Sequence, residues 1–154
     1  MPRCDFAFQH RFRVRWSETD AQGVVFNARY LDYADIAITE YWRAAKLREQ
    51  GGGEQLEFHV KKATVTWFAP ILPDEMIEVM ARTLAVGRTS ITQLIEIHGA
   101  TAAGSDDLRA TVDLVSVFVD LTTHRPQPLP EWIGPLFAVF DGQAPSAALV
   151  SEIA

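Results

Sequence analysis

The stretch Glu18-Thr19-Asp20-Ala21-Gln22-Gly23-Val24-Val25-Phe26-Asn27-Ala28-Arg29-Tyr30 joins a predicted strand to a predicted helix. Before it, apolar and polar side chains alternate from Phe6 to Trp16, which predicts a strand with one buried face. After it, apolar residues cover most of a helical wheel from Asn27 to about Leu47, which predicts a helix enclosed by other elements. The stretch therefore places one carboxylate, that of Asp20, in a turn just ahead of a helix N-terminus.

A carboxylate beside a helix N-terminus is suited to catalysis. The first N–H groups of a helix have no partners within it and carry the positive end of its dipole, so they stabilise an oxygen that gains negative charge. Asp20 is near enough in sequence to act on a group held there. The alternative is that Asp20 only caps a turn or the helix, a common use of Asp before Gly. Glu18 is a competing base that we expect to be solvated.

Four β-branched stretches follow the helix. Turns rich in Gly, Pro and Asp separate them and no second helix intervenes, which predicts an antiparallel sheet of the α+β class wrapped around the helix. Gly51-Gly52-Gly53 lacks a following Lys-Ser or Lys-Thr and favours a loop over a phosphate cradle. The proline-rich tail from Arg125 is expected to be extended, with a short helix near 131–140 and a disordered last dozen residues. The predicted strands are 58–68, 76–86, 89–98 and 109–121.

Composition predicts one globular domain over residues 1–154 in a chain with 48% hydrophobic and 22% charged residues. A net charge of −6 argues against nucleic acid as the main partner. Without an apolar run of about 20 residues or a signal-like N-terminus, we expect no membrane partner and a cytoplasmic location. The single cysteine, Cys4, sits in a terminus expected to fray, and the four histidines lack ligand spacing, so we expect no metal site.

The pattern Asp20-x-x-Gly23-Val24-Val25-x-x-x-x-Tyr30, followed by a long helix rich in Ala, Tyr and Ile, resembles the acyl-CoA thioesterases of the hotdog fold, and among them the 4-hydroxybenzoyl-CoA thioesterase group. The resemblance runs from about His10 to about Trp132. It implies about five strands around one central helix and hydrolysis of acyl- or aryl-CoA to a free acid and coenzyme A, without a cofactor. It also implies a homodimer or homotetramer with active sites at the dimer interface.

The resemblance assigns roles to residues of the motif. Asp20 matches the family's catalytic aspartate, either as general base toward water or as a nucleophile that forms a transient mixed anhydride. Asn27 takes the position whose backbone N–H faces the thioester carbonyl. Many bacterial relatives have histidine there, so the backbone donor is kept and an imidazole role is lost. Asn27 is also a favoured helix N-cap. Tyr30 resembles a tyrosine near the acyl group, although a lone aromatic on an apolar helix is more often core.

The remaining candidates concern substrate binding. Gly23 and Val24 belong to the motif, and Gly23 provides a positive φ or close approach of substrate, or is a plain turn glycine. Gly87-Arg88-Thr89-Ser90 resembles the family's strand junction near pantetheine and nucleotide, where Arg88, Thr89 and Ser90 meet phosphate or amide groups; a polar hairpin turn is the alternative. Weaker anion-contact candidates are Lys61, Lys62 and Arg125.

Two other functions stay open at this level. The first is an enoyl-CoA hydratase or acyl-carrier dehydratase on the same fold, although such relatives pair an Asp or Glu with a His and no such pairing is evident around Asp20. The second is an acyl-CoA-binding module without turnover. The absence of a Gly-x-Ser-x-Gly elbow counts against a serine hydrolase. The acyl group itself is left open, with aryl, short branched and long linear chains all compatible.

Overall fold

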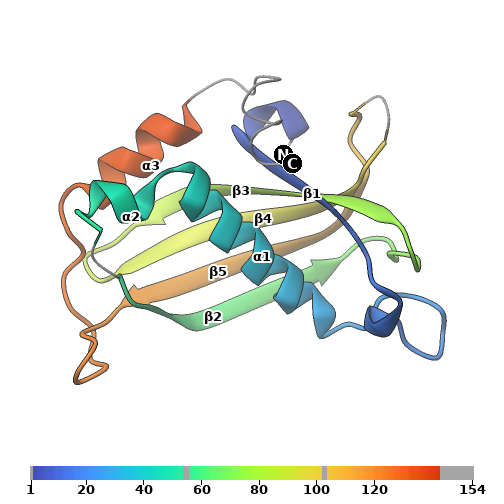
Figure 1. The fold of residues 1–154 in the computed structure, drawn as a ribbon, viewed down its shortest axis with the longest axis horizontal. Coiled ribbons are helices and arrows are strands. Elements are labelled where there is room, and N and C mark those ends of the chain that lie inside the picture. Colours follow the sequence, from blue (N-terminus) through green and yellow to red (C-terminus); the bar gives the residue numbers. More distant parts are fainter. Residues whose placement is uncertain (1, 54–55, 102–103, 143–154) are drawn as a thin grey trace.

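The computed structural model of the protein describes residues 2–53, 56–101 and 104–142. One five-stranded antiparallel sheet, in the order β1-β3-β4-β5-β2, curves around helix α1 (Figure 1). This is the α+β arrangement that the sequence predicts. The predicted disorder of the last dozen residues lies outside the described residues. The elements are η1 (Arg3–Asp5), β1 (Phe8–Arg13), η2 (Trp16–Glu18), α1 (Arg29–Ala44), α2 (Leu47–Gln50), β2 (Phe58–Trp67), β3 (Met76–Val86), β4 (Ser90–Gly99), β5 (Leu108–Phe118) and α3 (Ile133–Asp141).

The core lies between α1 and the concave face of the sheet. Tyr33, Ala37 and Tyr41 form a buried stripe along α1, and alternate residues of the strands, such as Ile95 and Val112, are buried opposite them. Full burial of an aliphatic side chain such as Ile95 or Val112 contributes roughly 1.5–3 kcal/mol. The spacing of three to four residues on the helix and of two on the strands explains why these segments adopt these elements.

The helix differs from the prediction in extent and in surroundings. Lys46 has a φ of 60°, so the predicted helix to about Leu47 ends at Ala44 and a short α2 follows. The helix is also not enclosed within one chain. Leu31 is 45% exposed, and Trp42 is only partly buried although its indole N–H donates to Gln93 of β4 at 3.2 Å. Apolar surface is therefore left uncovered along α1.

The N-terminal region also corrects two expectations. The predicted strand stops at Arg13, and Trp16, expected on the buried face, is 77% exposed. The reason is local: the Arg15 N–H donates to the Glu18 side chain at 2.6 Å, which turns the chain into η2. The segment around Cys4 is not frayed, because Arg3 beside it is buried and ion-paired with Glu78.

The edges of the sheet differ in cover. β1 and β2 are the two edge strands, and nearly all of β2 is exposed. Lys61 and Lys62 lie at the register shift of this strand and are exposed to solvent. Exposed lysines are common on edge strands, so their position does not require a role in anion binding. Helix α3, close to the predicted 131–140, packs beside β3 and stacks Phe137 on Tyr41 of α1, with ring centroids 5.2 Å apart. Among the described residues no helix has the length and apolar character needed to span a membrane.

Candidate active site

The loop of residues 19–27, the Asp20 loop, connects η2 to α1 and is closed by its own backbone. The Asp20 N–H donates to the Val24 carbonyl at 2.8 Å, and the Gly23 N–H donates to the Asp20 carbonyl at 3.0 Å. Thr19 and Val25 form a β-bridge across the loop. Gly23 has a φ of 77° with open space beside its α-carbon, so glycine serves the turn itself here. The loop is thus a defined turn that presents one carboxylate.

The Asp20 side chain is half-buried and only partly engaged. Its Oδ1 accepts the N–H of Gln22 at 2.8 Å, the bond of an Asx turn. Its Oδ2 accepts no hydrogen bond from the described residues. One oxygen therefore orients the carboxylate and the other is left for a water or a substrate. The capping role considered from sequence is real, and it leaves half of the carboxylate available for chemistry.

The start of α1 provides unpaired backbone donors. The helix begins at Arg29, two residues after Asn27, with Ala28 as the flanking residue and no side-chain cap. Asn27 is therefore not a side-chain N-cap. Within the described part of the chain, the N–H groups of Asn27 and Ala28 have no hydrogen-bond acceptor, and both residues are exposed. The sequence does not predict the Ala28 N–H as a donor, because an alanine side chain carries no signal for it.

Tyr30 and Glu18 have structural partners beside the loop. Tyr30 is only 2% exposed, and its ring meets that of Trp67 edge-on at 6.0 Å. Burial raises the pKa of its phenol, and the charge of Asp20 adds to this effect. Glu18 was a competing base, but its Oε1 accepts the Tyr33 hydroxyl at 3.0 Å as well as a backbone N–H. Glu18 is therefore held within the fold rather than solvated.

The predicted nucleotide-binding residues lie far from Asp20 within one chain. The Asp20 loop follows the end of β1 that pairs with Met76, where β3 begins, whereas Arg88 follows the other end of β3. Eleven residues of strand at about 3.3 Å each separate these ends by roughly 35 Å. Arg88 is exposed, and Thr89 and Ser90 are half-buried beside it. The structure does not bring the two groups of predicted residues together in a single copy.

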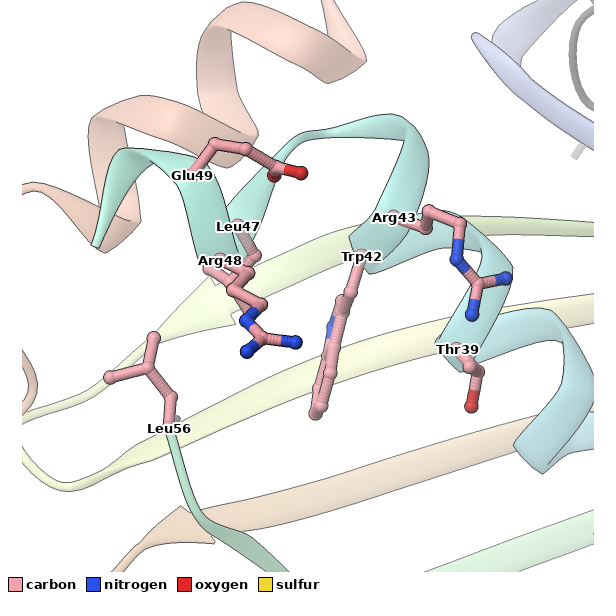
Figure 2. A pocket seen from close by; sticks show the side chains of 7 residues that line it. All are labelled: Thr39, Trp42, Arg43, Leu47, Arg48, Glu49 and Leu56. Atoms are coloured by element: carbon pink, nitrogen blue, oxygen red, sulfur yellow. The ribbon is translucent and has the colours of Figure 1, made fainter. Parts of the chain in front are cut away.

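Three cavities of the single chain lie along α1 and at α3. One of about 570 Å³ is formed by the end of α1, by α2 and by Leu56, with Trp42 between Arg43 and Arg48 (Figure 2). A second, of about 370 Å³, shares Trp42 and runs between α1 and β2 toward Leu31. A third lies between β3 and α3. None of these three is lined by Asp20. In the described part of the chain, no three or more His, Cys, Asp or Glu residues form a metal-binding group.

Comparison with known proteins agrees with this architecture. The Acyl-CoA thioester hydrolase YbgC of Escherichia coli O6:H1 is 31% identical over 127 residues, which cover 82% of this chain and 92% of that protein. A thioesterase from Thermus thermophilus, solved in complex with coenzyme A and Zn, superposes with a TM-score of 0.75 at 28% identity and covers 90% of this chain and 98% of its own. A 4-hydroxybenzoyl-CoA thioesterase complexed with 4-hydroxybenzoyl-CoA shares the fold, with a TM-score of 0.74 at 17% identity, covering 84% and 97%.

A curved antiparallel sheet around one long helix, with a carboxylate loop leading into that helix, defines a hotdog-fold protein of the thioesterase type. The family model described as the Thioesterase-like superfamily matches residues 14–137, from the end of β1 into α3. The chain belongs to this superfamily. The resemblance seen in the sequence around Asp20 is thus confirmed for the family and the fold.

Proposed function

We propose that this protein hydrolyses acyl-CoA thioesters to a free carboxylic acid and coenzyme A, with Asp20 and the start of α1 as its catalytic groups. One observation carries this proposal: among the described residues, none donates to Oδ2 of Asp20, and the loop leads into a helix start where the N–H groups of Asn27 and Ala28 have no acceptor. A tetrahedral intermediate needs such a pair, an activating carboxylate and donors for its oxygen. The named thioesterases among its relatives support the same reaction.

In the proposed reaction, the oxygen of the thioester carbonyl accepts hydrogen bonds from the N–H groups of Asn27 and Ala28. Asp20 then either removes a proton from a water that attacks the carbonyl carbon, or attacks that carbon itself to form a mixed anhydride that water opens. In both routes the C–S bond breaks, the sulfur leaves as the thiol of coenzyme A after gaining a proton, and water supplies the new oxygen of the acid. We propose no metal ion or redox cofactor for this reaction.

We propose that the active unit is a dimer built on the edge strand β2. An unpaired, exposed strand is a site for strand addition, and apolar side chains remain uncovered beside it, including Val60 on β2 and Leu31 on α1. A two-fold axis at this edge would align two β2 strands antiparallel and continue the sheet. It would also place the Arg88 end of one copy on the same side as the Asp20 end of the other.

In this dimer, Asp20 of one copy and Arg88 of the other could contact the same acyl-CoA molecule. Coenzyme A carries phosphates at one end and the thioester at the other, so its two ends need separate sites. We propose that Arg88, Thr89 and Ser90 of one copy bind phosphate or pantetheine groups while Asp20 of the other acts on the thioester. Arg88 is suited to this because its guanidinium forms no ion pair with a described residue and faces solvent.

A thiol-release assay over a panel of aryl-, short branched and long linear acyl-CoAs tests the proposed function. We expect steady release of free coenzyme A from at least one member, with loss of release in Asp20→Asn and Asp20→Ala. Tight binding without release from the parent protein would identify a binding module instead. Addition of water across the double bond of an enoyl-CoA, with the thioester intact, would identify a hydratase. Undiminished release in both Asp20 variants would refute the mechanism.

A further inference from the structure

Residues 68–75, the platform loop, join β2 to β3 and support the Asp20 loop. The Val25 N–H donates to the Ile71 carbonyl at 2.9 Å, which is the backbone hydrogen bond between the two loops. Ile71 is fully buried, so this contact is shielded from water. The aromatic contact between Tyr30 and Trp67 lies next to it. The position of the Asp20 loop therefore depends on where the platform loop is held.

Arg109, near the start of β5, holds the platform loop at both of its ends. Its backbone carbonyl accepts the N–H groups of Phe68 at 2.8 Å and Ala69 at 3.1 Å. Its guanidinium donates to the Pro70 carbonyl at 2.9 Å and to both carboxylate oxygens of Glu75, at 2.9 and 2.6 Å. A single residue, 34 positions away from Glu75 in sequence, thus fixes the first and the last residues of the loop.

The remaining contacts leave the guanidinium of Arg109 no freedom. Its Nε and Nη2 also donate to the two carboxylate oxygens of Asp107, at 3.1 and 2.8 Å, so all five N–H donors are used. The two carboxylates raise the pKa of Arg109, and Arg109 in turn lowers the pKa of Glu75 and of Asp107. Gly99 makes room for this cluster, because a Cβ there would collide with the Asp107 carboxylate and the Arg109 guanidinium.

The pKa of the Tyr30 phenol responds both to this cluster and to the carboxylate of Asp20. Burial is the main cause that raises the pKa of the Tyr30 phenol. A hydrogen bond with the backbone of Ile71 and the charge of Arg109 oppose the shift, while the charges of Glu75 and Asp20 add to it. Tyr30 is therefore within electrostatic range of both the Arg109 cluster and Asp20. The platform loop and the Asp20 loop form one continuous assembly around this ring.

We infer that Arg109 is a positioning residue for catalysis, which acts on Asp20 through the platform loop without touching the substrate. The inference rests on the proposed thioesterase function for its kinetic consequence. Its structural consequence is independent of that function: loss of the guanidinium removes its hydrogen bonds to Pro70 and Glu75, weakens the Val25–Ile71 bond and lets the Asp20 loop open. Lysine cannot replace this arginine, because one ammonium does not span three acceptor groups.

The test compares Arg109→Gln with Arg3→Gln, the matched control. Arg3 also forms a buried ion pair with a glutamate of β3, Glu78, but on the N-terminal segment rather than on the platform loop. Amide hydrogen exchange of residues 19–27 and thiol release are measured for both. Arg109→Gln is expected to speed exchange of the Val25 amide and to lower kcat roughly tenfold with KM within about twofold. Arg3→Gln is expected to leave both the loop exchange and kcat unchanged.

Gly99→Ala is a second route to the same state, because the added methyl displaces the Asp107–Arg109 pair. Glu75→Gln keeps an acceptor for Arg109 and for the Leu72 N–H, so it should show a smaller effect of the same kind. The inference is overturned if Arg109→Gln and Gly99→Ala leave loop exchange at the parental rate, or if Arg3→Gln speeds it equally. If the parent releases no thiol from any acyl-CoA, the proposed function fails, and the exchange comparison still decides the role of Arg109.

Discussion

The two ends of the sheet differ in whether their arginines are bonded within the fold or exposed to solvent. At the Asp20 end, Arg109 is 13% exposed at its side chain and all its donors are bound to carboxylates and a carbonyl. At the other end, Arg88 and Arg125 are exposed, and neither guanidinium forms an ion pair within the described part of the chain. Bond breaking needs groups fixed within a fraction of an ångström, whereas phosphates are bound by accessible charge. Under the proposed function, we therefore expect the first end to carry out the chemistry and the second to bind the nucleotide part of the substrate.

Neutralising Asp20 should have the largest effect on catalysis. Asp20→Asn keeps an acceptor for the Gln22 N–H but removes the base or nucleophile, so kcat should fall by about 10²- to 10⁴-fold while the affinity for coenzyme A is unchanged. Steady-state thiol release measures kcat, and calorimetry measures the affinity for coenzyme A. Asp113→Asn, on β5, is a control for the charge change and should keep parental rates.

Removing Arg88 should instead weaken binding. A charge-assisted hydrogen bond contributes about 1.5–3 kcal/mol, so Arg88→Ala should raise KM for acyl-CoA roughly tenfold or more and leave kcat near the parental value. Lys46→Asn removes one positive charge at a residue with positive φ, which Asn tolerates, and should leave KM unchanged. A fall in kcat without a change in KM for Arg88→Ala would contradict the assignment of this end to recognition.

Mixing the two variants tests whether the ends meet across a dimer. In a mixed dimer of Asp20→Asn and Arg88→Ala subunits, one of the two composite sites keeps both native residues. After unfolding and refolding an equal mixture, roughly a quarter of the parental activity should return at low substrate concentration, because half of the dimers are mixed. Activity no higher than the mean of the separate variants would place Asp20 and Arg88 in different sites or in one chain.

The smallest expected effect concerns acid stability. Arg109 holds the pKa of Glu75 below its ordinary value of about 4.3, so the folded state binds this proton less readily than the unfolded state. The contribution of Glu75 to the free energy of unfolding is therefore complete above about pH 4.3 and is lost as pH falls through the lower folded pKa. Glu75→Gln should be less stable than the parent near pH 7, by about 1–2 kcal/mol, with the gap closing toward pH 3. Urea unfolding of both proteins at several pH values measures this difference in the free energy of unfolding.

Periodicity in the sequence was enough for most of the fold. The predicted strand 76–86 coincides with β3, and the other three after the helix differ from the structure by at most three residues at either end, because β-branched stretches bounded by turn residues mark each strand. Trp16 shows the limit of this reasoning. Its place continued the alternation of β1, but a local bond between Arg15 and Glu18 ended the strand first.

The candidate site was predictable only where a local pattern marks it. Asp20 and Asn27 stand in a recognisable strand-to-helix stretch, so the sequence predicts them as candidates. The Ala28 N–H has no side-chain signature, and the contact of Arg109 with Glu75 joins residues 34 positions apart, which a single sequence does not reveal. The roughly 35 Å between Asp20 and Arg88 likewise became clear only from the register of β3.

A crystal structure of Asp20→Asn with an intact acyl-CoA would locate the thioester itself, because the slow variant holds the substrate before cleavage. We expect the thioester carbonyl carbon within about 3.5 Å of the side chain at position 20, with its oxygen about 2.7–3.1 Å from the N–H of Asn27 or Ala28. The nucleotide should lie against Arg88 of the second copy. A thioester bound elsewhere, with no contact to the start of α1, would refute the proposed catalytic roles of Asp20 and the helix start.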